Sequence, residues 1–290
     1  MNKSQNINRL KNIDLRSINF LLIGDILNHH KIFSTKKILN FLFFILMICM
    51  LKAVFFDMGG TILHGRDIPG INEKSFENVN KTLQKYGYSI KVKELSEAYE
   101  KAKEIIKNMT PEFIELELID RWKETLKILG VKQYDIIANE CMDAFFRVRQ
   151  GIGIVVYYDD FKPTIIQLRK MGLKLGLISN VDYSVMYFID ELKLRDYFDI
   201  LIFSWKVKWK KPHPKIFEIA TTKLKVKPEE SIMVGDSLRA DVGGANGIGM
   251  TSVWINRMNN DIDLQDLEPR PDYVIKNLME LIPIVDKLRK

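Results

Sequence analysis

The first residue that could do chemistry is Asp57, which ends the stretch Lys-Ala-Val-Phe-Phe-Asp. The four apolar residues before it do not alternate with polar ones, a pattern that predicts a buried strand. Gly59 and Gly60 follow and allow a sharp turn close to a ligand. Open α/β sheets bind ligands at the carboxyl ends of their strands, so Asp57 is a catalytic candidate. The same residues also suit a plain turn after a strand.

Two later apolar runs also end in polar side chains. Ser179 and Asn180 follow residues 173–178, and Asp236 follows residues 232–234. If these runs are parallel strands, their carboxyl ends meet at one edge of the sheet and bring the polar groups together.

A lysine and a further carboxylate complete the set. Lys211 stands in Lys-Lys-Pro-His-Pro, just before a segment that its prolines favour as a helix start, and Asp241 lies five residues after Asp236. Together with Asp57 they make three carboxylates and an ammonium group. Carboxylates this crowded repel one another unless a cation lies among them, and oxygen ligands suit Mg²⁺.

The second half of the chain alternates strand and helix signals. Apolar runs are separated by amphipathic segments, the pattern of a parallel sheet covered on both faces. The predicted strands are 53–56, 173–178, 200–203, 232–234, 251–255 and 273–275. The amphipathic segments between and after them are 163–171, 183–192, 214–224, 240–248 and 277–288. The predicted fold class is α/β, with a Rossmann-like parallel sheet.

Between the first two predicted strands the spacing becomes helical. Residues 72–150 carry apolar side chains at steps of three and four, which predicts four amphipathic helices packed as a small bundle. The third helix is expected to open at Thr110-Pro111, with threonine as its cap and Phe113 on its inner face. We therefore predict an N-terminal extension over 1–49, a core of 50–66 plus 152–290, and an inserted helical cap over 67–151.

Four stretches, taken in order, resemble the four motifs of the haloacid dehalogenase-like hydrolase superfamily. They are Asp57-Met58-Gly59-Gly60-Thr61, Leu177-Ile178-Ser179-Asn180, Lys211-Pro212-His213-Pro214 and Gly235-Asp236-Ser237-Leu238-Arg239-Ala240-Asp241. One such stretch is weak evidence, whereas four in order with a correctly placed insert are strong. The resemblance covers residue 50 to the end, and the insert is similar to the first-type cap of that superfamily.

The resemblance implies a role for each motif. Asp57 is the expected nucleophile, which forms an aspartyl-phosphate, and Ser179 binds the transferring phosphoryl group. Lys211 neutralises charge, Asp236 binds Mg²⁺, and Asp241 supports the metal directly or through a neighbour. Three further residues are expected to contact substrate: Gly60, Thr61 and Asn180.

Position 59 departs from the pattern of the superfamily's phosphatases. They usually carry an aspartate two residues after the nucleophile, where it protonates the leaving oxygen, and here Gly59 takes that place. Its carbonyl still suits a metal, but a missing general acid lowers the rate by about 10²–10⁴. Substrates with good leaving groups, another proton donor such as His64, and binding without turnover all stay open.

The function expected from these residues is Mg²⁺-dependent hydrolysis of a small phosphorylated metabolite. One alternative is a dehalogenase- or phosphonatase-like C–X hydrolase, because those members also lack the aspartate. The other is a non-catalytic phosphometabolite-binding protein. Substrate identity and oligomeric state are not predicted, because cap side chains set the first and no pattern addresses the second.

Charge and cysteine content limit partners and location. The net charge is +7, but residues 1–49 hold seven Lys or Arg against two Asp or Glu, and the remainder holds 37 against 35. The body is therefore almost neutral, which gives no case for nucleic acid. Cys49 and Cys141 are the only cysteines, and two such thiols favour a reduced, cytoplasmic protein.

The apolar run 38–51 carries no charged residue, and three interpretations of it stay open. It is too short for a comfortable membrane span, which needs about 20 residues. Translation from Met47 or Met50 would remove it, whereas a membrane-associating segment or a soluble arm would retain it. Membrane contact is expected only if the run is translated and exposed.

Overall fold

The computed structural model describes residues 51–258 and 268–289. The predicted extension 1–49 lies outside the described residues, as does all of the run 38–51 except Leu51. Within the described ranges, no helix combines the length and apolar character needed to cross a bilayer.

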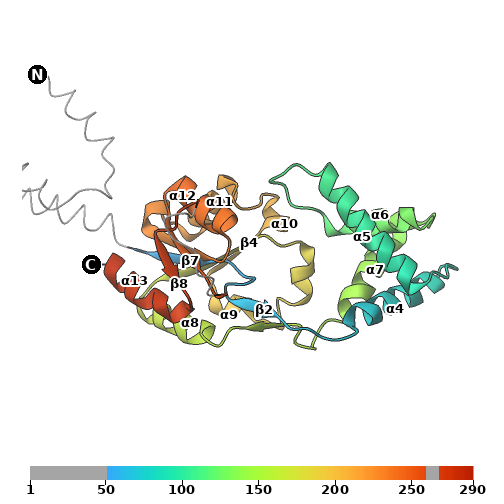
Figure 1. The fold of residues 1–290 in the computed structure, drawn as a ribbon, viewed down its shortest axis with the longest axis horizontal. Helices are drawn as coiled ribbons and strands as arrows, with labels where there is room; N and C mark the ends of the chain where they lie inside the picture. Colours follow the sequence, from blue (N-terminus) through green and yellow to red (C-terminus); the bar gives the residue numbers. More distant parts are fainter. Residues whose placement is uncertain (1–50, 259–267, 290) are drawn as a thin grey trace, which may run out of the picture. The chain divides into compact units, whose positions relative to one another are not determined.

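Six parallel strands form the main sheet, as the alternating pattern predicted (Figure 1). In spatial order they are β5 (Ile200–Phe203), β4 (Lys174–Ser179), β1 (Ala53–Phe56), β6 (Ser231–Gly235), β7 (Thr251–Ile255) and β8 (Tyr273–Ile275). The strand that precedes Asp57 is therefore central, with β4 and β6 as its neighbours.

Helices cover both faces of this sheet (Figure 1). They are α8 (Phe161–Lys170), α9 (Leu194–Tyr197), α10 (Ser204–Val207), α11 (Pro214–Leu224), α12 (Gly244–Ile248) and α13 (Leu281–Leu288). Val54 and Phe56 pack in the same cluster as α8 and α13, whereas Ala53 and Phe55 pack with α11 and α12. Burial on both faces explains why β1 is apolar without alternation.

The four helices of the insert are α4 (Ile71–Gln84), α5 (Val92–Met109), α6 (Leu118–Ile128) and α7 (Tyr134–Arg147). Their apolar stripes meet in a core of their own, in which Trp122 and Leu83 are fully buried. Truncating a side chain such as Trp122 to alanine would destabilise this core by about 3–5 kcal/mol. A short antiparallel pair, β2 (Leu63–Gly65) and β3 (Val155–Tyr157), flanks the insert in the chain.

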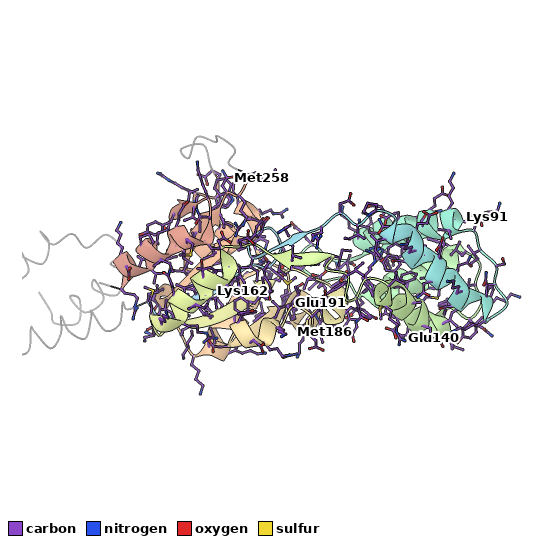
Figure 2. The ribbon with its side chains drawn as sticks, turned by 90° about the horizontal axis from the view of Figure 1, so that it is seen from below. Lys91, Glu140, Lys162, Met186, Glu191 and Met258 are labelled. Atoms are coloured by element: carbon purple, nitrogen blue, oxygen red, sulfur yellow. The ribbon has the colours of Figure 1, made fainter. Side chains whose placement is uncertain are left out.

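The insert returns to the core beside Glu191, which Figure 2 labels together with Lys91 and Glu140 of the insert and Lys162 of α8. The Gly151 amide donates a hydrogen bond to Glu191 Oε2 at 3.0 Å. The boundaries 67 and 151 stay predictions, but the insert leaves the core after β2 and rejoins it before β3.

The predicted start of the third helix is wrong. Thr110 is extended (φ −97°, ψ 130°) and follows the end of α5, and the next helix begins at Leu118. Proline at 111 disfavours helical geometry in the residue before it, which fits the extended Thr110. Phe113 is not on an inner helix face, because it lies before the helix begins at Leu118. Its carbonyl accepts a hydrogen bond from the Lys210 amide of the core at 2.8 Å.

Candidate active site

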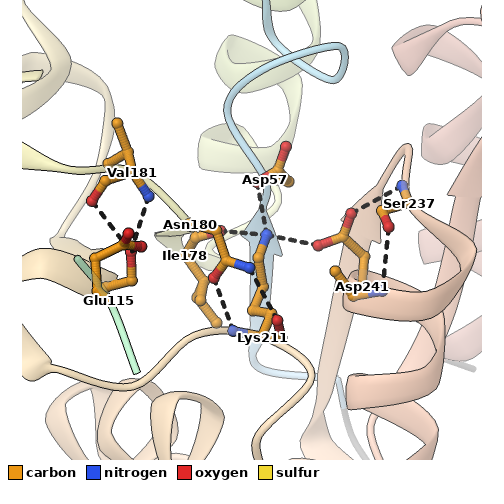
Figure 3. Close-up of polar contacts among 10 residues, drawn as sticks. Asp57, Glu115, Ile178, Asn180, Val181, Lys211, Ser237 and Asp241 are labelled. Carbon is orange, nitrogen blue, oxygen red and sulfur yellow. Dashed lines mark hydrogen bonds and ion pairs between the residues drawn. The ribbon is translucent and has the colours of Figure 1, made fainter. Parts of the chain in front are cut away.

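Asp57 and Lys211 form the centre of the site, where β1 ends (Figure 3). The Asp57 amide continues the sheet by donating to the Val234 carbonyl at 2.8 Å. Lys211 Nζ donates to Asp57 Oδ1 at 2.6 Å, to the Ile178 carbonyl at 2.8 Å and to Asp241 Oδ1 at 2.5 Å. All three ammonium hydrogens are thus used, which fixes the lysine against the nucleophile candidate.

The loop that carries Lys211 is held by Asn180. The Asn180 amide nitrogen donates to the Lys211 carbonyl at 2.9 Å, and the Lys211 amide donates to Asn180 Oδ1 at 2.7 Å (Figure 3). This reciprocal pair joins the end of β4 to the loop before α11. The Asn180 side chain therefore already makes two hydrogen bonds to the Lys211 backbone. Its contact with substrate stays a prediction.

Asp241 is buried beside the end of β6, where Gly235 leaves space for its carboxylate. Its Oδ2 accepts from the amide of Ser237, the residue before the π-helical turn Leu238–Gly243, at 3.0 Å. A Cβ atom on Gly235 would lie 2.2 Å from the Asp241 carboxyl carbon. Glycine at 235 therefore lets a buried carboxylate approach the end of β6.

The turn after Asp57 has two glycines with different demands. Gly60 has a positive φ of 71°, and a Cβ there would lie 2.2 Å from Asp236 Oδ2. Glycine is therefore required at 60 on both conformational and steric grounds. Gly59 lies outside the left-handed region, and a Cβ there would meet no heavy atom within 4 Å.

Two hydroxyl groups near this turn are candidates for an anionic ligand. Ser179 is buried at the end of β4, on the strand edge where Asp57 lies. Thr61 is fully buried, and its Oγ1 lacks a hydrogen-bond partner within the described part of the chain. Buried hydroxyls are normally hydrogen-bonded, so the Thr61 oxygen in particular is suited to binding a ligand.

The Thr61 backbone is fixed by an arginine that the sequence did not single out. Arg257 donates to the Thr61 carbonyl from Nη2 at 2.6 Å and from Nε at 3.1 Å. The same guanidinium pairs with both oxygens of Asp160 at 2.9 and 3.0 Å and lies 3.7 Å from the Tyr158 ring centroid. The only sequence signal for Arg257 is its place just after a predicted strand.

The three carboxylates form one cluster. One oxygen of each of Asp57, Asp236 and Asp241 lies within 4.8 Å of the others. Burial raises the pKa of Asp241 to about 7 against the opposing charge of Lys211, and burial followed by the Asp57 charge raises the pKa of Asp236. Burial alone would lower the pKa of Lys211, but Asp241 and Asp57 raise it above its usual value.

This charge balance fits a divalent cation. Three carboxylates face one ammonium group, which leaves two negative charges if all are ionised. Burial is the main cause that raises the pKa values of Asp236 and Asp241, and the negative charge of Asp57 raises both further. An ion of charge +2 with a preference for oxygen ligands, such as Mg²⁺, would balance the surplus negative charge.

His64 does not contact the carboxylate cluster. Its ring packs against Tyr158 with centroids 4.7 Å apart, and Nδ1 lies 3.3 Å from the Gly65 carbonyl. Its role as a proton donor stays a prediction.

Comparison with known proteins identifies the family to which this chain belongs. Residues 51–249 match the model of the haloacid dehalogenase-like hydrolases. A glyceraldehyde 3-phosphate phosphatase of Methanopyrus kandleri is 30% identical, and the match covers 83% of this chain and all of the relative. The chain belongs to the haloacid dehalogenase-like hydrolase family.

Two further proteins show how far this hydrolase resembles its relatives. The N-acylneuraminate-9-phosphatase of Mus musculus is 27% identical, over 82% of this chain and 94% of the relative. The crystal structure of a HAD phosphatase from Thermococcus onnurineus is 33% identical, with a TM-score of 0.56, and covers 83% of this chain and all of that one. The predicted family and fold class are confirmed.

The haloacid dehalogenase-like fold brings Asp57, Lys211, Asp236 and Asp241 together and leaves Ser179 at the same strand edge. Sequence reasoning missed the structural use of Asn180 and the pair formed by Arg257 and Asp160. No local pattern marks Asp160, because its contacts come from residues about 100 positions away.

Proposed function

We propose that this hydrolase removes phosphate from a small phosphorylated metabolite, with Mg²⁺ and an aspartyl-phosphate on Asp57. The observation that carries the proposal is the 2.6 Å contact between Lys211 Nζ and Asp57 inside a cluster of three carboxylates. An ammonium group so placed neutralises both a carboxylate nucleophile and phosphoryl oxygens. The relatives named above act on phosphorylated small molecules, as their names state.

The reaction proceeds in two displacements. An Asp57 carboxylate oxygen attacks phosphorus, the bond from phosphorus to the leaving oxygen breaks, and that oxygen takes up a proton. Water then attacks the aspartyl-phosphate, releases inorganic phosphate and restores Asp57. Lys211 holds the nucleophile throughout, and the hydroxyls of Ser179 and Thr61 hydrogen-bond the transferring group.

Asp57, Asp236 and the Gly59 carbonyl would hold Mg²⁺, with Asp241 supporting it directly or through a neighbour. When bound, the ion neutralises negative charge on the phosphoryl oxygens. The backbone carbonyl at 59 is available for this purpose whichever side chain stands there. Substrate contacts are assigned to Gly60, Thr61 and Asn180.

Residues 67–151 are proposed to act as a cap over a core formed by 50–66 and 152–290. The insert has its own apolar core, and its segment 113–115 hydrogen-bonds residues next to Lys211. A cap in contact with the catalytic loop can exclude water and select substrate. The free thiol of Cys141 supports the proposed cytoplasmic location.

Turnover of p-nitrophenyl phosphate tests the function most directly. We expect hydrolysis in Mg²⁺, its loss in excess chelator and its return when Mg²⁺ is restored. Asp57→Asn should abolish turnover, because an amide cannot form the aspartyl-phosphate, whereas Asp159→Asn, at an exposed aspartate, should not. Full activity in chelator, above all toward a haloacid, would overturn the phosphatase proposal in favour of a C–X hydrolase. Phosphate-ester binding without turnover would indicate a binding protein.

A further inference from the structure

Residues 111–117, here named the linking segment, connect α5 to α6 and pair with the core beside Lys211. The Lys210 amide donates to the Phe113 carbonyl at 2.8 Å, and the Glu115 amide donates to the Lys208 carbonyl at 3.2 Å. These two hydrogen bonds form an isolated antiparallel β-bridge between Ile114 and Trp209. The paired residues therefore end one position before the lysine that holds Asp57.

The Glu115 side chain makes a second connection to the core. Its Oε2 accepts a hydrogen bond from the hydroxyl of Ser204, which is fully buried at the start of α10. Ser204 Oγ in turn accepts from the Val181 amide at 2.8 Å. Figure 3 shows Glu115 beside Val181, next to the group formed by Asn180 and Lys211.

Glu115 decides which way the Ser204 hydroxyl points. A hydroxyl has one hydrogen, and the alternative acceptor for it is the Val181 carbonyl at 3.1 Å. While the carboxylate takes that hydrogen, Ser204 Oγ presents a lone pair to the Val181 amide. Without it, the hydroxyl is free to turn toward the Val181 carbonyl, and the hold on residue 181 changes.

The two connections converge on the same pair of loops. Val181 directly follows Asn180, whose side chain makes both hydrogen bonds to the Lys211 backbone. Lys208 and Lys210 precede Lys211 on the other loop. The linking segment thus contacts both backbone segments that position Lys211 next to Asp57. It does so through Glu115 and its neighbours.

We propose that Glu115 is a positioning residue that, from the helical insert, fixes the loops carrying Asn180 and Lys211. The proposal rests on the proposed phosphatase function, because it concerns how well Lys211 is aligned for phosphoryl transfer. A displacement of about 1 Å in such a group can lower the rate about 100-fold. Removing the carboxylate should therefore lower kcat about 10- to 100-fold and leave KM less affected.

The linking segment supplies its own controls. Glu112 pairs with Arg239, and Glu117 pairs with Lys208, and both side chains of each pair are well exposed. Exposed ion pairs contribute little free energy. Glu112→Ala removes a carboxylate from the same segment without touching Ser204, so it separates a specific role of Glu115 from a general loss of charge.

The experiment measures kcat and KM for p-nitrophenyl phosphate in Mg²⁺ with six variants, which are three substitutions of Glu115, Ser204→Ala, a double variant and the control Glu112→Ala. Glu115→Ala and Glu115→Asp should both lose kcat, the second because its carboxylate is one methylene shorter. Glu115→Gln retains an acceptor oxygen at full length and should recover most of kcat. Ser204→Ala combined with Glu115→Ala should lose no more than the stronger single variant, because both act through one hydrogen bond.

A second readout does not need turnover. Amide hydrogen exchange at Val181 should quicken in Glu115→Ala and stay at the wild-type rate in Glu112→Ala, since only the first alters the group that accepts this amide. If Glu115→Ala does not fold, the contrast between Glu115→Asp and Glu115→Gln decides the matter.

The outcomes separate the two proposals. A wild-type protein without phosphatase turnover would overturn the proposed function, while the exchange rate at Val181 would still test the contact. An active wild type whose Glu115→Ala and Glu112→Ala variants share the same kcat and the same Val181 exchange would overturn the role of Glu115 alone. Additive losses in the double variant would also overturn it.

Discussion

Replacing Gly59 with aspartate tests whether this position limits the hydrolysis of ordinary phosphate esters. The substitution is possible because Gly59 lies outside the left-handed region and a Cβ there meets no heavy atom within 4 Å. The neighbouring Gly60 would not tolerate it, since a Cβ there lies 2.2 Å from Asp236 Oδ2. Where the backbone suits a side chain, replacing glycine changes the free energy of unfolding by about 0.4–1 kcal/mol in the stabilising direction.

The expected gain depends on the leaving group. General acid catalysis contributes about 10²–10⁴ in rate when the leaving oxygen needs a proton. Alkyl phosphates release a strongly basic alkoxide, so Gly59→Asp should raise their kcat/KM by about 100-fold. The p-nitrophenolate ion leaves without a proton, and its ester should gain little. The selectivity of the gain, rather than its size, is the decisive quantity.

The assay compares kcat/KM for glycerol phosphate and p-nitrophenyl phosphate in Mg²⁺. Gly59→Asn is the matched control, because it has the same shape and cannot donate a carboxyl proton. Gly65→Asp adds a carboxylate at another glycine that is open to a Cβ and outside the left-handed region. Thermal melting of each variant establishes that the protein is folded.

A folded Gly59→Asp variant with no selective gain on the alkyl ester would refute the missing-acid explanation. It would show that another group already supplies the proton. His64 would then be tested first, although its ring lies on Tyr158 and makes no contact with the carboxylate cluster. An equal gain for Gly59→Asn would also count against proton transfer, since an amide has no such proton to give.

Two further predictions concern regions outside the catalytic centre. A chain that begins at Met50 should be folded and as active per mole as the full chain, because every assigned residue lies from Asp57 onward; lower activity or a lower melting temperature would show that residues 1–49 contribute to the body. Glu230→Gln should lower the free energy of unfolding by about 1–2 kcal/mol at pH 7, since Glu230 accepts from Lys52 Nζ at 2.7 Å. Burial alone would raise the pKa of Glu230, but Lys52 and the Lys227 amide hold it below its usual value of 4.5. The stabilising effect is therefore present above pH 4.5 and lost as the pH falls through the folded-state pKa, so denaturant titrations of both proteins should converge in acid.

The sheet and the motif residues could be predicted because their signals are local. β1 is a run of apolar residues, and burial on both faces is what such a run requires. Parallel pairing then places the carboxyl ends of β1, β4 and β6 together, so the meeting of Asp57, Ser179 and Asp236 follows from the topology. The positions of Lys211 and Asp241 follow less directly, because each depends on a loop whose shape is set by other residues.

The residues that shape those loops could not be predicted from local patterns. Asn180 is predicted to contact substrate, and that prediction stands; what the sequence does not show is that its side chain holds the backbone of Lys211, 31 positions further along the chain. Its amide can both donate and accept, and the sequence does not show which polar group its partner will be. The same holds for Arg257, whose partners Thr61 and Asp160 lie 196 and 97 positions away.

The linking segment shows most clearly how a distant contact overrides a local signal. Thr110-Pro111 has the composition of a helix start. In a helix that began there, the Phe113 carbonyl and the Glu115 amide would make hydrogen bonds within the helix. In the folded chain these two groups are used by Lys210 and Lys208 of the core. The helix is delayed until Leu118, and the seven residues before it become the contact through which the insert reaches Lys211. A prediction that extended the helix to Thr110 therefore had no means of identifying Glu115, because its role depends on the segment being outside any helix.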